Sequence, residues 1–396
     1  MQRSHLRFLF LNAGHFITHF LVLIFATVAA LRLTTEWGMT YAQLIPYATP
    51  AFVAFGLFAI PAGWLADKWS REGMMAIFFV GIGASSVVSS FASSPLEIGF
   101  CLTLIGLFAA IYHPVGLAMV VQGREKMGVP LAINGVFGNM GVASAALVTG
   151  LLIDSSGWRS AFVIPGITSI VFGMLYLAFE STGDKQEWVE VAFANDQVRP
   201  VGVSRNILIR VFGVIFFTTA VGGIIFQSTT FSLPRVFDER LSDIAGSASL
   251  VGLYTFLVFA VAAFAQLVVG YLIDHGSIRT VFAWVAILQT LFFTVMIQLT
   301  GLPALIVAIA FMFVVFGEIP INDVLVGRMA SSEWRSRAYG ITYIIGFTMS
   351  AAALPMIAWI HGSWGFDALF AVLAILALVI FIAVLFLPKN ERVFQI

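Results

Sequence analysis

Four ionisable residues interrupt long apolar stretches of this 396-residue chain: His15, His19, His113 and Glu318. Ionisable groups at membrane depth are costly, so residues in such places are candidates for function. Imidazole and carboxylate groups can exchange protons near neutral pH or bind transition-metal ions. His15 and His19 are four positions apart, which places them on one face of a helix.

Glu318 is the only acid near the middle of a long apolar stretch that could span a membrane, and we predict it to be the proton-coupling residue. It follows the apolar stretch 311–316 and stands two positions before Pro320. Low polarity disfavours a charged carboxylate. Such a carboxyl group can release a proton toward one side of a membrane and take one up from the other. The structural alternative is a permanent hydrogen bond from Glu318 to a neighbouring helix.

Structural roles also stay open for the other polar candidates. Each histidine could lock a helix pair by hydrogen bonding to a backbone carbonyl. Asn134, Asn139 and Gln227 could contact a ligand or make interhelical hydrogen bonds. Tyr343 is a further candidate for a cavity.

A charged turn occurs once in each half of the chain. Gly63, Leu65 and Asp67 are followed by Lys68, Ser70 and Arg71, and the pattern returns 207 positions later around Gly270, Leu272 and Asp274. A small glycine lets spans approach closely. Two related bundles with the substrate site between the repeats are typical of secondary transporters. The repeat therefore favours a gating role for Gly63, Asp67, Arg71 and Asp274 over a role as topology markers.

Composition indicates an integral membrane protein. Hydrophobic residues make up 60% of the chain and charged residues 10%, against about 25% charged residues in soluble domains. The zero net charge gives no sign of nucleic-acid binding. Segments of about 20 apolar residues predict twelve spans, at residues 8–31, 43–66, 74–93, 96–121, 129–153, 158–180, 209–232, 247–273, 280–300, 303–327, 338–360 and 365–387.

These spans predict an all-α integral membrane protein with three parts. Residues 1–180 form an N-terminal six-helix bundle, 181–208 a cytoplasmic linker and 209–396 a C-terminal six-helix bundle. With a cytoplasmic N-terminus, sixteen of the twenty Lys and Arg residues fall on the cytoplasmic side. We therefore predict that both termini are cytoplasmic.

The whole chain resembles the major facilitator superfamily through the loop at Gly63, Leu65, Asp67, Lys68 and Arg71. The N-terminal half is also similar to the fosmidomycin-resistance group of exporters. That similarity rests on Gly14-His15, on Tyr112-His113-Pro114 and on the stretch 138–141.

The superfamily resemblance implies a fold of twelve helices in two bundles, with spans 1, 4, 7 and 10 lining a central cavity. Spans 1, 4 and 10 contain the four ionisable candidates. The resemblance also implies that Asp67 faces the start of span 11, near Arg335 and Arg337. Asp323 lies closer to the cytoplasm, where it could join this gate or pair with Arg328 or Arg335.

We therefore predict a secondary transporter, not an enzyme, that exports a small organic solute by proton-coupled alternating access. Proton-coupled uptake, or transition-metal transport through the histidines and Glu318, are the alternatives. The predicted partners are the solute, protons and the lipid bilayer of the cytoplasmic membrane. The chain is expected to act as a monomer without cofactor, resident metal or nucleic acid.

Overall fold

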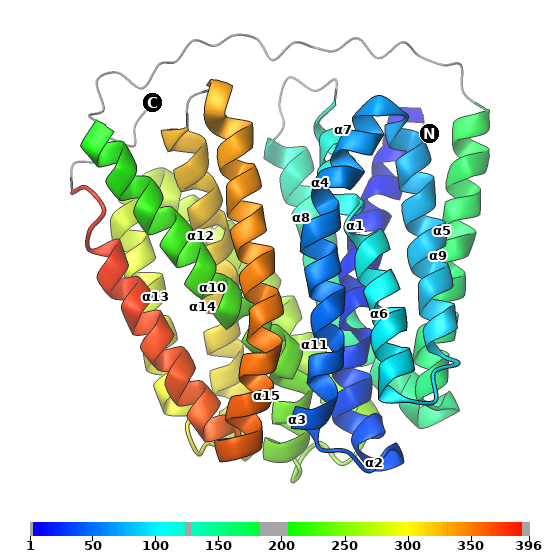
Figure 1. Cartoon of the computed structure of the whole chain (residues 1–396). Helices are drawn as coiled ribbons and strands as arrows, with labels where there is room; N and C mark the ends of the chain where they lie inside the picture. Colours follow the sequence, from blue (N-terminus) through cyan, green and yellow to red (C-terminus); the bar gives the residue numbers. More distant parts are fainter. Residues whose placement is uncertain (1–2, 123–127, 183–204, 331, 390–396) are drawn as a thin grey trace. The chain divides into compact units, whose positions relative to one another are not determined.

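The computed structural model describes residues 3–122, 128–182, 205–330 and 332–389, without the side chains of residues 128, 332–337 and 339. Every regular element in these ranges is helical (Figure 1). Hydrocarbon offers no water to backbone groups, so a spanning segment has to pair its own N–H and C=O groups. A chain this apolar therefore satisfies its backbone within helices.

Contacts between residues divide the chain into two compact units. The first comprises Met1–Ala192 and Ala245–Phe256, and the second comprises Phe193–Ile244 and Leu257–Ile396. Residues 245–256, in the sequence range predicted as the second bundle, thus pack with the first unit. The first unit contains α1 (Arg3–Val28), η1 (Ala29–Leu33), α2 (Thr34–Glu36), α3 (Tyr41–Leu44), η2 (Ile45–Ala48), α4 (Thr49–Lys68), α5 (Arg71–Ser89), α6 (Pro95–Ala109), η3 (Tyr112–Gly116), α7 (Leu117–Val121), α8 (Gly128–Ser156) and α9 (Trp158–Ser181).

The second unit contains five long helices and part of a sixth that begins in the first unit. The sixth is α11 (Ala248–Ala263). The others are α10 (Arg205–Arg240), α12 (Ala265–His275), α13 (Ile278–Met296), α14 (Gly301–Met329) and α15 (Ser332–Val384). Helix α10 packs on α14 and α15, and α13 packs on α14 and α15. In the first unit the largest packed pairs are α1 with α8 and α5 with α9.

Eleven segments of the described chain are long and apolar enough to cross a membrane. The last of them lies in α15, whose 53 residues would extend about 80 Å as one helix, against a hydrocarbon core of about 30 Å. The backbone breaks at Gly365, which has a φ of 76°. This left-handed conformation suits glycine, which has no Cβ to clash. The break divides α15 into two spans, so the predicted fold of twelve transmembrane helices is confirmed.

The helix ends differ most from prediction in α10. It begins at Arg205, within the range predicted as linker, and continues to Arg240, eight residues past the predicted end of that span at 232. Residues 183–204 of the predicted linker lie outside the described residues. Arg240 is buried and donates to Oδ1 of Asp367 over 2.6 Å and to the carbonyl oxygens of Met296 and Leu299. These partners let the polar end of α10 stay helical.

Large apolar side chains are exposed on the outside of many helices, including Leu57, Ile167 and Trp284. Large exposed apolar surfaces are unusual in soluble monomers. They are expected where lipid is the solvent.

Candidate functional site

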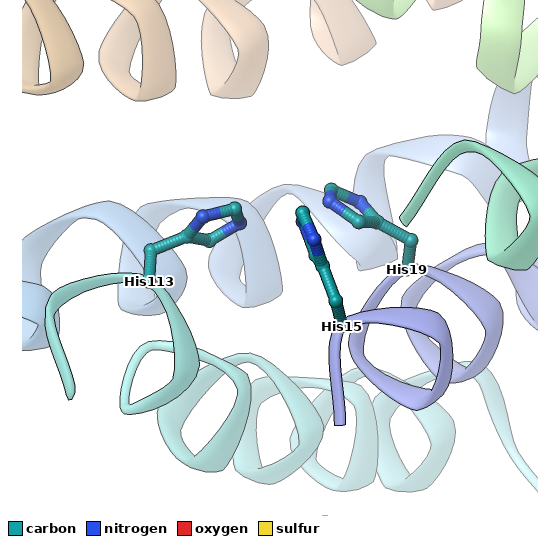
Figure 2. Close-up of side chains that lie close together, drawn as sticks. All are labelled: His15, His19 and His113. Atoms are coloured by element: carbon teal, nitrogen blue, oxygen red, sulfur yellow. The ribbon is translucent and has the colours of Figure 1, made fainter. Parts of the chain in front are cut away.

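Three of the four intramembrane candidates lie side by side in the first unit. His15 and His19 come from α1 and His113 from η3, and Figure 2 shows their rings turned toward one another. The ring centroids are 5.1 Å apart for His15 and His19, 5.3 Å for His15 and His113, and 5.4 Å for His19 and His113. One nitrogen from each ring lies within 4.8 Å of the other two. We call these three residues the histidine cluster.

The backbone of α8 fixes the ring of His15. The distance between His15 Nδ1 and the carbonyl oxygen of Asn134 is 2.8 Å. A carbonyl only accepts, so Nδ1 carries the proton, and in the neutral ring Nε2 carries the lone pair. A Cβ added to Gly138 would lie 2.6 Å from that Nε2. The glycine at 138 therefore gives the ring its space.

A buried hydrogen-bond network supports this anchor. Asn134 donates from Nδ2 to Oδ1 of Asn12 and to the hydroxyl of Tyr112, each over 2.9 Å. The Tyr112 hydroxyl donates to the carbonyl oxygen of Leu11 over 2.8 Å. Since the Tyr112 ring also stacks on His15 at 4.9 Å, the network holds α1, η3 and α8 together around the imidazole.

His113 lies in a π-helical segment, and such segments are frequent at functional sites. The following Pro114 lacks an N–H and disrupts the regular α-helical pattern there. A Cβ added to Gly63 of α4 would lie 3.2 Å from Cβ of Pro114. The absence of a side chain at Gly63 therefore allows α4 to approach Pro114 closely, in line with the close approach of spans that the sequence predicted at this glycine. The equivalent Gly270 has nothing within 4 Å of an added Cβ among the described residues.

The spacing of the rings limits their charge. Two imidazolium ions about 5 Å apart repel by about 3 kcal/mol at an effective dielectric constant of about 20. Neutral rings avoid that repulsion and offer nitrogen lone pairs. The histidine cluster can therefore hold a single proton, accept or donate hydrogen bonds to a solute, or coordinate a metal ion.

Glu318 belongs to the second unit, where it is buried on α14. Its Oε2 accepts a hydrogen bond of 2.8 Å from Nε2 of Gln289 on α13. Its Oε1 is buried with no hydrogen-bond partner among the described residues. A Cβ added to Gly222 of α10 would lie 2.7 Å from Oε1. The carboxyl group therefore has one satisfied oxygen and one oxygen that faces a glycine.

The remaining binding candidates lie in different surroundings. Gln227 on α10 is buried, and its Nε2 has no hydrogen-bond partner among the described residues. The buried Nδ2 of Asn139 on α8 is in the same situation. Tyr343 is 44% exposed, with its ring stacked at 6.2 Å on Phe347.

The first charged turn forms its ion pair locally. Oδ1 of Asp67 accepts from Nη2 of Arg71 over 2.8 Å, and the Asp67 side chain is 65% exposed. The repeat extends to the helix caps. Ser70 Oγ accepts from the N–H of Gly73 over 3.0 Å, and Ser277 Oγ, 207 positions later, accepts from the N–H of Thr280 over 3.4 Å. Both turns therefore start the following helix with the same capping interaction.

In the second turn the acid reaches a different partner. Asp274 Oδ1 lies 3.7 Å from Nη2 of Arg328 on α14. Arg328 is one of the residues considered as a partner of Asp323, and in the structure Asp274 lies beside it. Asp323 is partly buried on α14, the helix that also carries Arg328. The side chains of Arg335 and Arg337 lie outside the described residues. The gating roles of these residues stay predictions.

The sequence profile of the Major Facilitator Superfamily matches residues 11–242 and 240–394. A 4-hydroxybenzoate transporter of Pseudomonas putida is 24% identical over 37% of this chain and 33% of its own length. A probable sulfoacetate transporter of Cupriavidus necator is 24% identical over 49% of this chain and 47% of its own length. The matched regions thus cover between a third and a half of these relatives.

A solved structure shows the same fold over almost the entire chain. It is a bacterial homologue of the human lysosomal transporter Spinster, in an inward-facing and occupied conformation. The similarity has a TM-score of 0.72 and 15% sequence identity, and it covers 97% of this chain and 94% of that one. These relatives come from several groups and do not single out the fosmidomycin-resistance exporters.

Proposed function

We propose that this chain, which belongs to the major facilitator superfamily, is a proton-coupled secondary transporter of a small organic solute. Membership of this family indicates transport rather than enzymatic catalysis. The observation that carries the proposal is the buried carboxyl group of Glu318, with Oε2 bonded to Gln289 and Oε1 without a hydrogen-bond partner among the described residues. Burying a carboxyl group at membrane depth costs free energy, so a carboxyl group in this position is a candidate for a function.

The proposed coupling mechanism uses the proton on Glu318 as a ligand that biases a two-state equilibrium. A protonated carboxyl group is neutral and has an O–H to donate, whereas the carboxylate only accepts. The two forms therefore prefer different surroundings. A proton that binds one state of the transporter more tightly shifts the population toward that state.

We propose a carboxylate or sulfonate as the solute class. The names of two relatives, a 4-hydroxybenzoate transporter and a probable sulfoacetate transporter, both refer to organic anions. The histidine cluster offers N–H groups that can donate to an anionic oxygen. A protonated ring would add a charge-assisted hydrogen bond.

We propose export as the direction, because the N-terminal half resembles fosmidomycin-resistance exporters at Gly14-His15 and around Tyr112-His113-Pro114. The proposed location is the cytoplasmic membrane, with both termini inside and the chain acting as a monomer. In a Cys101→Ser background, single cysteines in place of Phe91 and Thr182 test this orientation. A membrane-impermeant maleimide added to intact cells should label only the first. Labelling of both from outside would overturn the orientation.

The functional experiment uses the full chain in proteoliposomes. A thermal-shift screen of hydroxybenzoates and short sulfonates first identifies a solute, because a ligand of the folded state raises its apparent stability. Flux of that solute is then measured with and without an imposed pH gradient. We expect accumulation only with the gradient. Equal flux in both conditions would overturn proton coupling. Accumulation of the solute against the direction of proton flow supports export, and accumulation along it supports uptake.

A further inference from the structure

We propose that the histidine cluster binds a late first-row divalent metal ion, with Zn²⁺ as the probe. One nitrogen from each of His15, His19 and His113 lies within 4.8 Å of the other two. The rings approach from two separate segments, α1 and η3 (Figure 2). Three imidazoles gathered in this way form a ligand set that suits Zn²⁺, Cu²⁺ and Ni²⁺, and not Mg²⁺ or Ca²⁺.

The surroundings of His15 support a metal more specifically. Metal-binding histidines usually donate their second ring N–H to a carbonyl or carboxylate, which fixes the tautomer and the ring orientation. His15 Nδ1 makes this bond with the carbonyl oxygen of Asn134 over 2.8 Å. The bond leaves Nε2 as the nitrogen with the lone pair. The bonds of Asn134 to Asn12 and Tyr112 hold this outer layer in place.

The distances require only a small contraction. Zinc–nitrogen bonds are about 2.0–2.1 Å long, and structural and catalytic sites are close to tetrahedral. Two nitrogens on one such ion are therefore about 3.3 Å apart. Ring rotations of His19 and His113 can bring nitrogens that lie within 4.8 Å to that spacing, while His15 stays anchored.

Three protein ligands leave one position on a tetrahedral ion. Water or an anionic oxygen of a solute can take that position. A bound ion would also supply positive charge without the repulsion between protonated rings. This inference does not depend on proton coupling, because metal binding is measured at equilibrium without transport.

The test uses the purified full-length protein in detergent, prepared with an affinity tag that contains no histidine and stripped of metal by a chelator. Zinc is titrated in competition with a chromogenic chelator. We expect one zinc per chain, with no competition from excess Mg²⁺. His15→Ala, His19→Ala and His113→Ala should each weaken binding by at least about tenfold. X-ray absorption of the zinc complex should show three imidazole nitrogens at about 2.0–2.1 Å.

Two further variants separate loss of the site from loss of the fold. His275→Ala removes an exposed histidine at the end of α12 and should bind zinc like the wild type. Gly138→Ala keeps all three ligands but places a Cβ 2.6 Å from His15 Nε2, so it should weaken zinc binding while the protein stays monodisperse. Zinc affinity that is the same in the wild type, the three histidine variants and Gly138→Ala would overturn the proposal. A failed proton-gradient assay with normal zinc binding would overturn only the proposed function.

Discussion

Gln289 on α13 donates a hydrogen bond from Nε2 to Oε2 of Glu318 on α14 over 2.8 Å, and both side chains are buried. Gly222 of α10 lies beside the other carboxyl oxygen. Three helices of the second unit therefore meet at one carboxyl group. A shift of any of them changes its surroundings, which is the property that a coupling residue needs.

Glu318→Gln should abolish accumulation driven by a pH gradient. The amide has nearly the shape of the carboxyl group and can still hydrogen-bond to Gln289, but it cannot release a proton. Solute exchange without a gradient should continue, because exchange does not require net proton movement. Both fluxes are measured in proteoliposomes with the same amount of protein. Accumulation at the wild-type rate would show that Glu318 is not the coupling site.

Gln289→Leu should destabilise the second unit, because it leaves Glu318 buried without its observed donor. A buried polar group that loses its partner costs about 1–3 kcal/mol. Replacing both partners by apolar residues can be nearly neutral, so the double variant Gln289→Leu with Glu318→Leu should recover most of that loss. The free energies of unfolding of the wild type, of the single variants Gln289→Leu and Glu318→Leu, and of the double variant give the coupling energy. Additive effects would contradict a stabilising bond between the two side chains.

Hydropathy predicted the positions of the spans, because each span has to be apolar over about 20 residues. The internal repeat and the superfamily resemblance predicted their division into two bundles. The break in α15 was also predicted, because the sequence ends one span at residue 360 and begins the last at residue 365. The structure places the break at Gly365, which has a φ of 76°. The end of α10 was not. Asp238, Glu239 and Arg240 resemble a loop in the sequence, whereas in the structure Arg240 is buried at the helix end by its hydrogen bonds to Asp367 and to the carbonyl oxygens of Met296 and Leu299.

Part of the candidate site was also visible in the sequence. Ionisable residues in apolar runs stand out, which is why the histidines were recognised. The polar residues that support the site were harder to predict. Gln289, which bonds to Glu318, and Asn12, which bonds to Asn134, are uncharged, and each is one of many polar residues in the spans. The pairing of Asn12 with Asn134 joins positions 122 residues apart. Such pairs depend on how helices cross, and a single sequence does not determine those angles.

Asn134→Leu should destabilise the first unit. The substitution removes two buried hydrogen bonds and leaves Asn12 Oδ1 without the donor it has in the structure. We expect a loss of about 1–3 kcal/mol. Denaturation in detergent measures it. Thr103→Val is the matched control, because among the described residues the Thr103 hydroxyl donates to the carbonyl of Gly99 in its own helix, and its effect should be smaller. Equal effects of the two variants would show that the network contributes no special stability.

Asp67→Asn should slow transport without a large loss of stability. Asp67 is 65% exposed, and its observed partner is Arg71, four residues later. Exposed pairs of this kind contribute about 0.3–0.5 kcal/mol, so a strong effect on transport would have to come from a different contact of the carboxylate. We expect the same behaviour from Asp274→Asn in the second repeat. Solute exchange in proteoliposomes and the denaturant midpoint separate the two effects.

A charge exchange decides whether the local pair or a more distant partner matters for Asp67. The double variant Asp67→Arg with Arg71→Asp keeps an ion pair between the same two positions but reverses its direction. If the turn needs only that pair, the double variant should transport like the wild type. If Asp67 closes a gate against another helix, a positive charge at position 67 cannot accept hydrogen bonds there, and transport should stay as slow as in Asp67→Asn. We expect the second result, because Asp67 and Asp274 recur at equivalent positions while their observed partners, Arg71 and Arg328, do not.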